Sequence, residues 1–389
     1  MSEGSEMVEM GGEVFEVRRP QIKMIYREYT NGDGRVTTLG VTARDDGRQS
    51  NRILVGTSTG RVVMHNPWGS EEEVGTDYES VVYKDSSARS ITSVGGFKRT
   101  TNTGQKKVEY FIFIQVRTLG VIILKDITDQ PEDHAGLRIY FKEIKVIESD
   151  HHGFCPVRAY EKSLYIPTSD KLILVHKNNE CDTIRLKSKG SPMCMDLLGE
   201  SAVVGSEDGF VAIYKPNLSK QDHPFELAVM EQIFDSPIFS LTVYQLTLDV
   251  IVGTVGHPIK VLDGRTLEVK QIIPFPASAR GCGALSYTGF SPTGQIAKDI
   301  TKMFIAGFWD GSIRMYRQQK DLSFVEKSAM ESQQDGGERR STTSLVWMIG
   351  NELYSACEDG NLYLYEMFKT KKLTRVEKEE YLKKKKASS

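Results

Sequence analysis

The sequence has few cysteines and no apolar run long enough to cross a membrane. Its 389 residues include five cysteines, which are scattered and never form a Cys-x-x-Cys pair. A disulfide framework and a zinc knuckle are therefore not expected. The uncharged stretch near the middle of the chain, residues 236–248, is shorter than the roughly 20 apolar residues of a membrane helix. We therefore expect no membrane segment.

Motifs that carry catalysis or bind cofactors are also scarce. Residues 56–60 match the Gly-x-Ser-x-Gly pattern around Ser58, but that pattern works only at a strand-to-helix turn, and here it lies in a predicted hairpin. Residues 150–155 hold two histidines and a cysteine, yet no second His or Cys cluster completes a metal site. Residues 281–283 lack the third glycine of a dinucleotide site. We predict no catalytic residue, no cofactor and no metal.

The two ends of the chain carry opposite charge, although the net charge is only −2. Residues 1–13 hold four Glu and no basic residue, and residues 369–389 hold nine Lys and Arg against three Glu. We predict a disordered acidic tail over 1–13. Over 369–389 we predict a basic tail, in which 376–386 has the pattern of a short surface helix; a nuclear-import or phosphate-binding patch is the alternative to a merely solvated tail. The start of the chain lacks the apolar segment of a secretory signal, so we expect the protein in the nucleus and cytoplasm.

One pattern recurs seven times: a short apolar run, a turn with glycine or a polar residue, and a second alternating run. The copies span residues 53–66, 110–126, 163–177, 201–215, 249–263, 302–317 and 352–366. Alternating β-branched and aromatic residues on both sides of each turn predict a β-hairpin. Further strand candidates precede most of the hairpins and follow several of them, so each unit is expected to contain four strands.

Seven units of four strands predict an all-β fold, a seven-bladed β-propeller over residues 14–368. A closed ring needs a fourth strand in its last blade. The seventh hairpin ends at Glu366 and is followed by a charged segment. We therefore predict that an N-terminal strand, within residues 21–29, closes the last blade.

The hairpins resemble the core of the WD repeat. An Asp-Gly turn is kept in three copies, at Asp208, Asp310 and Asp359. In the same copies a tyrosine replaces the tryptophan of the WD dipeptide, at Tyr214, Tyr316 and Tyr365. No copy has the dipeptide itself, and the Gly-His pair that normally precedes a blade is missing. We expect a degenerate WD-repeat propeller, held together mainly by burial between its sheets.

The hairpin turns of a propeller and the loops that enter each blade share one rim. This rim is predicted to carry seven candidate protein-binding residues: Glu207, Asp208, His257, Trp309, Asp310, Glu358 and Asp359. A partly exposed tryptophan among acidic residues is typical of a binding hot spot that faces a basic partner. The alternative is that an aspartate at such a turn only caps its own backbone.

Residues 153–215 carry a more specific resemblance. The segments GFC (153–155), LYIPTSDKLILVHK (164–177), CDTIRLKSKGSPMCMDL (181–197) and AVVGSEDGFVAIYK (202–215) resemble the family of ASTRA-associated protein 1 and guanine-nucleotide-binding-protein β-subunit-like protein 1. The run Gly190-Ser191-Pro192-Met193-Cys194 is its most telling part. Weaker similarity includes residues 115–117 and 305–316.

The resemblance implies a non-enzymatic scaffold that acts with Tel and Tti co-chaperone proteins. Its role would be the maturation and stability of phosphatidylinositol-kinase-related kinases, with links to chromatin remodelling and the DNA damage response. The expected partners are those co-chaperones and kinases, with the protein a monomer within a complex. We expect no small-molecule substrate. Because the sequence lacks a basic stripe with interleaved aromatic residues, we also expect no direct binding of nucleic acid. The alternative is a general WD-repeat adaptor, such as a ubiquitin-ligase substrate receptor or a trafficking subunit.

Overall fold

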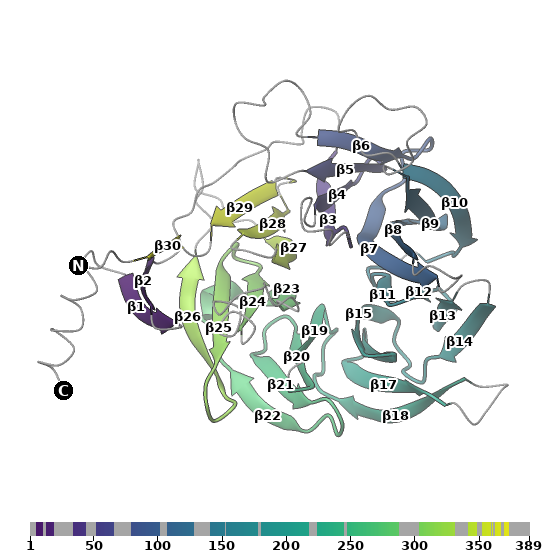
Figure 1. Cartoon of the computed structure of the whole chain (residues 1–389). Helices are drawn as coiled ribbons and strands as arrows, with labels where there is room; N and C mark the ends of the chain where they lie inside the picture. The colour runs from purple at the N-terminus through teal and green to yellow at the C-terminus, as the bar shows by residue number, and fades with distance from the viewer. Residues whose placement is uncertain are drawn as a thin grey trace, which may run out of the picture.

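The computed structural model describes most of the chain. The described residues are 5–10, 13–18, 34–43, 52–65, 79–101, 107–127, 141–151, 153–177, 180–217, 224–244, 247–287, 303–330, 341–347, 352–358, 360, 362–366 and 369–372. Within them, seven antiparallel sheets stand around a central axis (Figure 1). The seven-bladed β-propeller predicted from the repeats is therefore confirmed.

Each blade runs from an inner strand to an outer strand in chain order. Blade 1 is β3 (Val36–Val41), β4 (Ile53–Thr57), β5 (Arg61–His65) and β6 (Glu79–Lys84). Blade 2 is β7 (Ile91–Thr101), β8 (Lys107–Val116), β9 (Gly120–Asp126) and β10 (Phe141–Glu148). Blade 3 is β11 (Arg158–Tyr160), β12 (Ser163–Pro167), β13 (Leu172–Lys177) and β14 (Glu180–Arg185).

The remaining blades follow the same order. Blade 4 is β15 (Pro192–Leu198), β16 (Ser201–Ser206), β17 (Phe210–Pro216) and β18 (Phe225–Gln232). Blade 5 is β19 (Ser240–Tyr244), β20 (Asp249–Gly253), β21 (Ile259–Asp263) and β22 (Val269–Ile273), and the short 3-10 helix η2 (Ala277–Ala279) follows it. Blade 6 is β23 (Cys282–Tyr287), β24 (Met303–Phe308), β25 (Ile313–Gln318) and β26 (Phe324–Met330). Blade 7, in the described part of the chain, is β27 (Thr342–Trp347), β28 (Glu352–Cys357) and β29 (Leu362–Glu366).

The middle strands of the blades make up most of the core. β4, β20 and β24 are buried along their whole length, whereas the outer strand β10 is mostly exposed. A middle strand is covered by neighbouring blades on both faces, so a short continuous apolar run suits it. An outer strand lies at the rim and carries polar side chains.

One hydrophobic cluster fills each of the seven interfaces between neighbouring blades. The cluster that closes the ring packs Tyr354 and Ala356 of blade 7 against Val36, Leu39 and Ile53 of blade 1. Each fully buried aliphatic side chain contributes roughly 1.5–3 kcal/mol to folding. Apolar packing thus contributes to the closure of the ring, together with hydrogen bonds from the backbone N–H of Val36 to the Gly360 carbonyl and of Leu39 to Ser344 Oγ.

The tyrosines at the WD position are core residues. Tyr214, Tyr316 and Tyr365 have exposures of 2%, 0% and 2%. The Tyr214 hydroxyl accepts a hydrogen bond of 2.8 Å from the backbone N–H of Lys187, whereas the Tyr316 hydroxyl is buried without a hydrogen-bond partner. What the three positions share is burial in the core.

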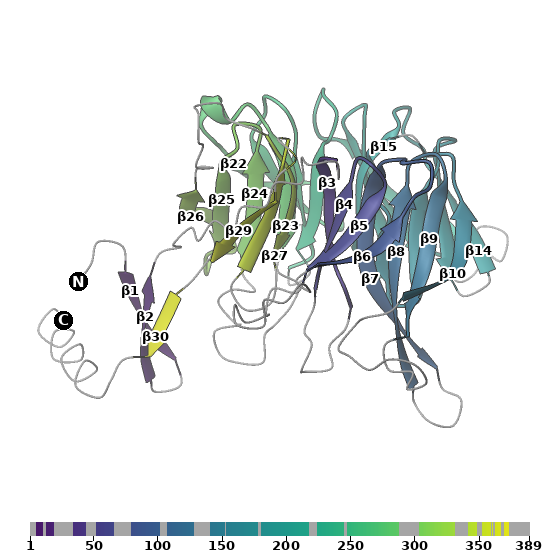
Figure 2. The ribbon, with the colours of Figure 1, turned by 90° about the horizontal axis from the view of Figure 1, so that it is seen from above.

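The two ends of the chain form a separate sheet outside the ring (Figures 1 and 2). β1 (Ser5–Met10) pairs with β2 (Glu13–Arg18), and β2 pairs with β30 (Lys369–Lys372). The structure thus describes Ser5–Met10 as a strand within the segment 1–13, for which the sequence predicts disorder. Its partner β2 is its neighbour in the chain, and the C-terminal strand β30 adds to β2.

Two further predictions concern segments outside the described residues. These are the closing strand of blade 7 within residues 21–29 and the surface helix over residues 376–386. Both stay predictions. In the part of the chain that the structure describes, no helix has the length and apolar character needed to cross a bilayer.

Candidate protein-interaction surface

Most of the candidate binding residues lie on one face of the ring. The turns between the second and third strands of all blades lie on the same face, which is uppermost in Figure 2 and is called the upper face. Four turns carry the candidates: Glu207 and Asp208 after β16, His257 after β20, Trp309 and Asp310 after β24, and Glu358 after β28. These six residues, from blade 4 to blade 7, are called the upper arc. Asp359 lies outside the described residues.

Two aspartates of the upper arc serve the backbone around them. Asp310 Oδ1 accepts a hydrogen bond of 2.9 Å from the backbone N–H of Ser312. Asp208 Oδ2 accepts bonds from the backbone N–H groups of Lys189 (3.0 Å) and Gly190 (2.9 Å). Burial raises the pKa of Asp208, but hydrogen bonds from a serine hydroxyl and from the backbone outweigh it, so the pKa lies below its usual value. Both carboxylates therefore cap loops, the alternative raised for such turns.

Trp309 forms the aromatic centre of the upper arc. Its ring meets Phe239 edge to face, with ring centroids 5.4 Å apart and an interplanar angle of 67°. Both side chains are partly exposed. The absence of a side chain at Gly283 permits this position of the indole, since a Cβ there would lie 2.7 Å from Trp309 Nε1. The pair presents an aromatic surface that spans blades 5 and 6.

Hydrogen bonds fix the backbone of Trp309 relative to blade 7. The Ser341 hydroxyl donates to the Trp309 carbonyl at 3.1 Å. The backbone N–H of Glu358 donates in turn to the Ser341 carbonyl at 2.8 Å. Glu358 is exposed. An exposed carboxylate thus occupies the turn next to Trp309.

His257 and Asp235 extend the upper arc over blade 5. His257 Nε2 lies 2.9 Å from Asp235 Oδ1, and the two side chains are 40% and 82% exposed. The imidazole also packs 5.5 Å from the ring of Phe234. Exposed pairs of this kind add little to stability. Because Asp235 is largely exposed, its carboxylate is accessible to a partner.

Sequence reasoning missed Phe239 and Asp235 as surface residues. Phe239 stands at the start of the inner strand of blade 5, one residue before Ser240, which pairs with Gly253. The corresponding residues are Met193 in blade 4 and Gly283 in blade 6, where the strand registers shift. An alignment of the inner strands at the positions of Met193, Phe239 and Gly283 would have shown that, of these three blades, blade 5 alone has an aromatic residue at this position.

The motifs set aside in the sequence have structural roles. Ser58 Oγ accepts a hydrogen bond of 3.0 Å from the backbone N–H of Arg35. Burial raises the pKa of the Cys155 thiol to about 12, so it stays protonated at neutral pH. His151 is buried, and His152 lies outside the described residues. In the described ranges, no three His, Cys, Asp or Glu side chains are grouped to hold a metal ion.

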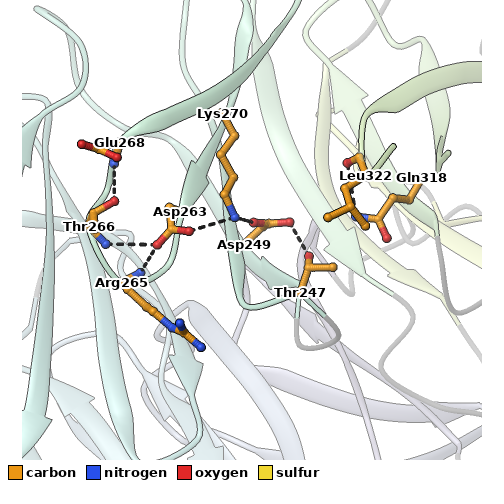
Figure 3. Close-up of polar contacts among 9 residues, drawn as sticks. All are labelled: Thr247, Asp249, Asp263, Arg265, Thr266, Glu268, Lys270, Gln318 and Leu322. Atoms are coloured by element: carbon orange, nitrogen blue, oxygen red, sulfur yellow. Dashed lines mark hydrogen bonds and ion pairs between the residues drawn. The ribbon is translucent and has the colours of Figure 1, made fainter. Parts of the chain in front are cut away.

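A dense charge cluster lies in blade 5 at the strand ends opposite the upper face (Figure 3). Lys270 Nζ is 2.7 Å from Asp249 Oδ1 and 2.9 Å from Asp263 Oδ2. The Thr247 hydroxyl donates to Asp249, and the backbone N–H of Arg265 donates to Asp263 at 2.8 Å. Asp249 is only 3% exposed. The cluster joins β20, β21 and β22, so its role is structural.

Comparisons with known proteins identify the class of the fold. No protein-family model and no curated protein sequence matches this chain. The WD40 β-propeller domain of Doa1 superposes with a TM-score of 0.58 at 13% identity, over 89% of this chain and 96% of that domain. Raptor of Chaetomium thermophilum gives a TM-score of 0.62 at 9% identity, over 90% of this chain and 30% of its own. The computationally designed protein Ika8 gives 0.53 at 11% identity, over 90% and 99% of the two chains.

These identities show likeness of fold alone. The chain is a seven-bladed β-propeller, and its fold is like that of WD40 propeller domains.

Proposed function

We propose that this protein is a non-enzymatic scaffold that docks a basic segment of a partner protein on its upper arc. The observation that carries the proposal is the partly exposed Trp309–Phe239 pair. Aromatic residues anchor binding hot spots. Exposed carboxylates at Glu207, Asp235 and Glu358 lie in loops of the same face, and they favour a partner of positive charge.

The proposed cellular role is that of a co-chaperone subunit in the Tel and Tti pathway. In this role the protein supports the stability of phosphatidylinositol-kinase-related kinases in the nucleus and cytoplasm, as a monomer within a complex. The resemblance of residues 153–215 to the family of ASTRA-associated protein 1 supports this role. The runner-up is an adaptor of another complex, such as a ubiquitin-ligase receptor or a trafficking subunit.

Affinity purification followed by mass spectrometry separates the two roles. The full chain with an affinity tag is expected to recover Tel and Tti homologues together with large kinases. Recovery of cullin adaptors or coat subunits in their place would favour the runner-up and sink the co-chaperone role.

The docking surface itself is tested by Trp309→Ala. Loss of a hot-spot tryptophan costs about 2 kcal/mol of binding free energy, so we expect roughly 30-fold weaker partner recovery in a quantitative pull-down. Circular dichroism should show an unchanged fold.

The matched control is Phe154→Ala. Phe154 is 70% exposed and lies next to Arg117 of blade 2, away from the upper arc. Its removal should leave partner recovery unchanged. Equal recovery by the Trp309 variant and the wild type would place the docking surface elsewhere.

A further inference from the structure

Basic side chains gather between blades 2 and 3, at the ends of the strands away from the upper face. They are Arg99, Lys125, Lys142 and Lys145 of blade 2 and His176 of blade 3, and together they are called the basic cluster. None of them belongs to the upper arc.

The strand register places these residues on facing surfaces. Side chains two residues apart in a strand share a face. Phe97 packs against blade 3, so Arg99 lies on that face too. The same spacing relates Ile123 to Lys125, Ile147 to Lys145 and, on blade 3, Leu174 to His176. Lys142 is directly opposite Lys125.

The imidazole of His176 is held by Lys145. Lys145 Nζ lies 2.7 Å from His176 Nε2. An ammonium group can only donate, so Nε2 accepts and the ring hydrogen is on Nδ1. Burial lowers the pKa of His176, and Lys145 and Arg99 lower it further, which keeps the ring neutral. Nδ1 is buried without a hydrogen-bond partner, in a side chain only 4% exposed.

Arg99 is a cation with two buried nitrogens that have no acceptor. Its Cζ lies 5.3 Å from the ring centroid of Phe97 and 5.1 Å from that of Phe111. Its Nε and Nη2 are buried with no hydrogen-bond partner. Glu109 is opposite Arg99 in the register, but its carboxylate pairs with Lys125 at 2.7 Å. The nearby carboxylate is therefore already engaged.

Arg314 in blade 6 shows the arrangement that Arg99 lacks. Its guanidinium also lies near a ring, 5.8 Å from the centroid of Phe308. There the chain supplies a carboxylate, since Arg314 Nη1 donates to both oxygens of Glu326 at 3.0 and 2.8 Å. A buried donor without an acceptor costs about 1–3 kcal/mol. The basic cluster thus has the donors that an anion site needs.

We infer that the basic cluster binds the phosphate of a phosphorylated serine or threonine in a partner polypeptide. A phosphate dianion offers three oxygens and suits the donors of Arg99, Lys145 and His176 better than a singly charged carboxylate does. Among the described residues of this cluster, four cations lie with one carboxylate, that of Glu109, so a doubly charged group is favoured. The inference rests on the proposed scaffold function only for the carrier of the phosphate, a protein.

The edge of blade 2 favours a polypeptide as that carrier. Among the described strands, β10 is the outer strand of its sheet and has β9 as its one neighbour. The free edge can pair with an extended peptide. Lys142 and Lys145 are on this strand, so a peptide at this edge lies next to these two lysines. Arg99 is on β7, at the opposite edge of the sheet, and is farther from such a peptide.

The test is calorimetric titration of the full chain with a short blocked phosphoserine peptide. The same peptide with serine or glutamate in place of phosphoserine serves as the reference. We expect the phosphoserine peptide to bind at least about tenfold more tightly than both, because charge-assisted hydrogen bonds contribute about 1.5–3 kcal/mol. Arg99→Gln and Lys145→Gln should each weaken its binding by at least about tenfold.

Lys260→Gln is the matched control, since Lys260 Nζ also lies over an aromatic ring, 4.4 Å from the centroid of Phe234, but far from the basic cluster. It should bind the peptide as the wild type does. Unchanged binding by Arg99→Gln would overturn the site. Equal affinity for inorganic phosphate, or binding only to phosphoinositide vesicles, would overturn the assignment to a polypeptide.

A second measurement separates a binding role from a structural one. Arg99→Leu removes two unpartnered donors, so without ligand its Tm should equal or exceed that of the wild type. Arg314→Leu removes a paired cation and should lower Tm. A lower Tm for Arg99→Leu would show that Arg99 only holds blade 2 together. Both titration and melting use purified protein, so their outcome is independent of the partner recovery that tests the upper arc.

Discussion

Some charged side chains are buried at strand ends, and an oppositely charged partner stabilises them there. Asp249 is the clearest case, because its carboxylate is almost fully buried and pairs with Lys270. Lys270 also holds Asp263, and hydrogen bonding to Lys270 lowers the pKa of Asp263 to about 2. Burial lowers the pKa of Lys270, but its two carboxylate partners outweigh this, so the net shift is upward.

Lys270→Met should therefore destabilise the ring at neutral pH. The change leaves Asp249 buried without a cation, which costs about 2–4 kcal/mol. The free energy of unfolding from urea denaturation measures it. Lys177→Met is the control, since Lys177 and Glu200 form an exposed pair at 3.7 Å, and it should cost less than about 0.5 kcal/mol.

The difference between wild type and Lys270→Met should depend on pH in a defined way. Asp263 has a folded pKa of about 2, below its ordinary value of 3.8. Its contribution is thus complete above about pH 4 and is lost as pH falls towards 2. The raised pKa of Lys270 keeps the cation charged up to at least its ordinary value of 10.5. A stability difference that disappeared between pH 5 and 8 would contradict this assignment.

At the scale of elements, blades are separate sheets, and side chains connect their outer strands. Gln271 of β22 bonds to the backbone of Phe324, the first residue of β26. Its Nε2 donates to the Phe324 carbonyl at 2.8 Å, and its Oε1 accepts from the Phe324 N–H at 2.7 Å. The amide of Gln271 thus makes two hydrogen bonds with the backbone of Phe324, as a neighbouring strand would, and it links blades 5 and 6.

Gln271→Ala should weaken the contact between these two blades. The N–H of Phe324, a residue only 2% exposed, would lose its acceptor, at a cost of about 1–2 kcal/mol. The midpoint of urea unfolding should fall with an unchanged slope. The exposed Gln232 provides the control: Gln232→Ala should change stability by less than about 0.5 kcal/mol, and an equal effect of both changes would refute the bridging role.

For the whole molecule, closure of the ring depends on the interface between blades 7 and 1. Apolar packing contributes to that interface, while the sheet of β1, β2 and β30 stands outside the ring. The closing strand predicted within residues 21–29 would add backbone pairing to β29, the outermost described strand of blade 7.

Two truncations separate these contributions. Removal of residues 1–18 takes away β1 and β2 and should leave the calorimetric Tm of the ring unchanged. Removal of residues 1–33 also takes away the predicted closing strand and should lower Tm. The same Tm for both truncated proteins would contradict closure by residues 21–29.

Much of the fold was predictable because its signals are local. Alternating apolar residues on both sides of a turn predict each hairpin. In residues 201–215, β16 and β17 form around a turn that contains Gly209, whose φ is +80°. A Cβ at Gly209 would lie 2.1 Å from the Phe234 carbonyl oxygen, so the turn tolerates only glycine. Asp208 and Asp310 were placed on the right turns, but whether they cap or bind depends on groups distant in the chain.

The amino-acid sequence by itself determined the number of blades, the hairpin of each blade and the turn positions, because these depend on residues close together in the chain. Only the tertiary structure decided which side chains meet across blades. It brings Trp309 to Phe239, Lys145 to His176, and β30 to β2. Such contacts follow from ring closure and strand register, which bring together residues that no local pattern connects.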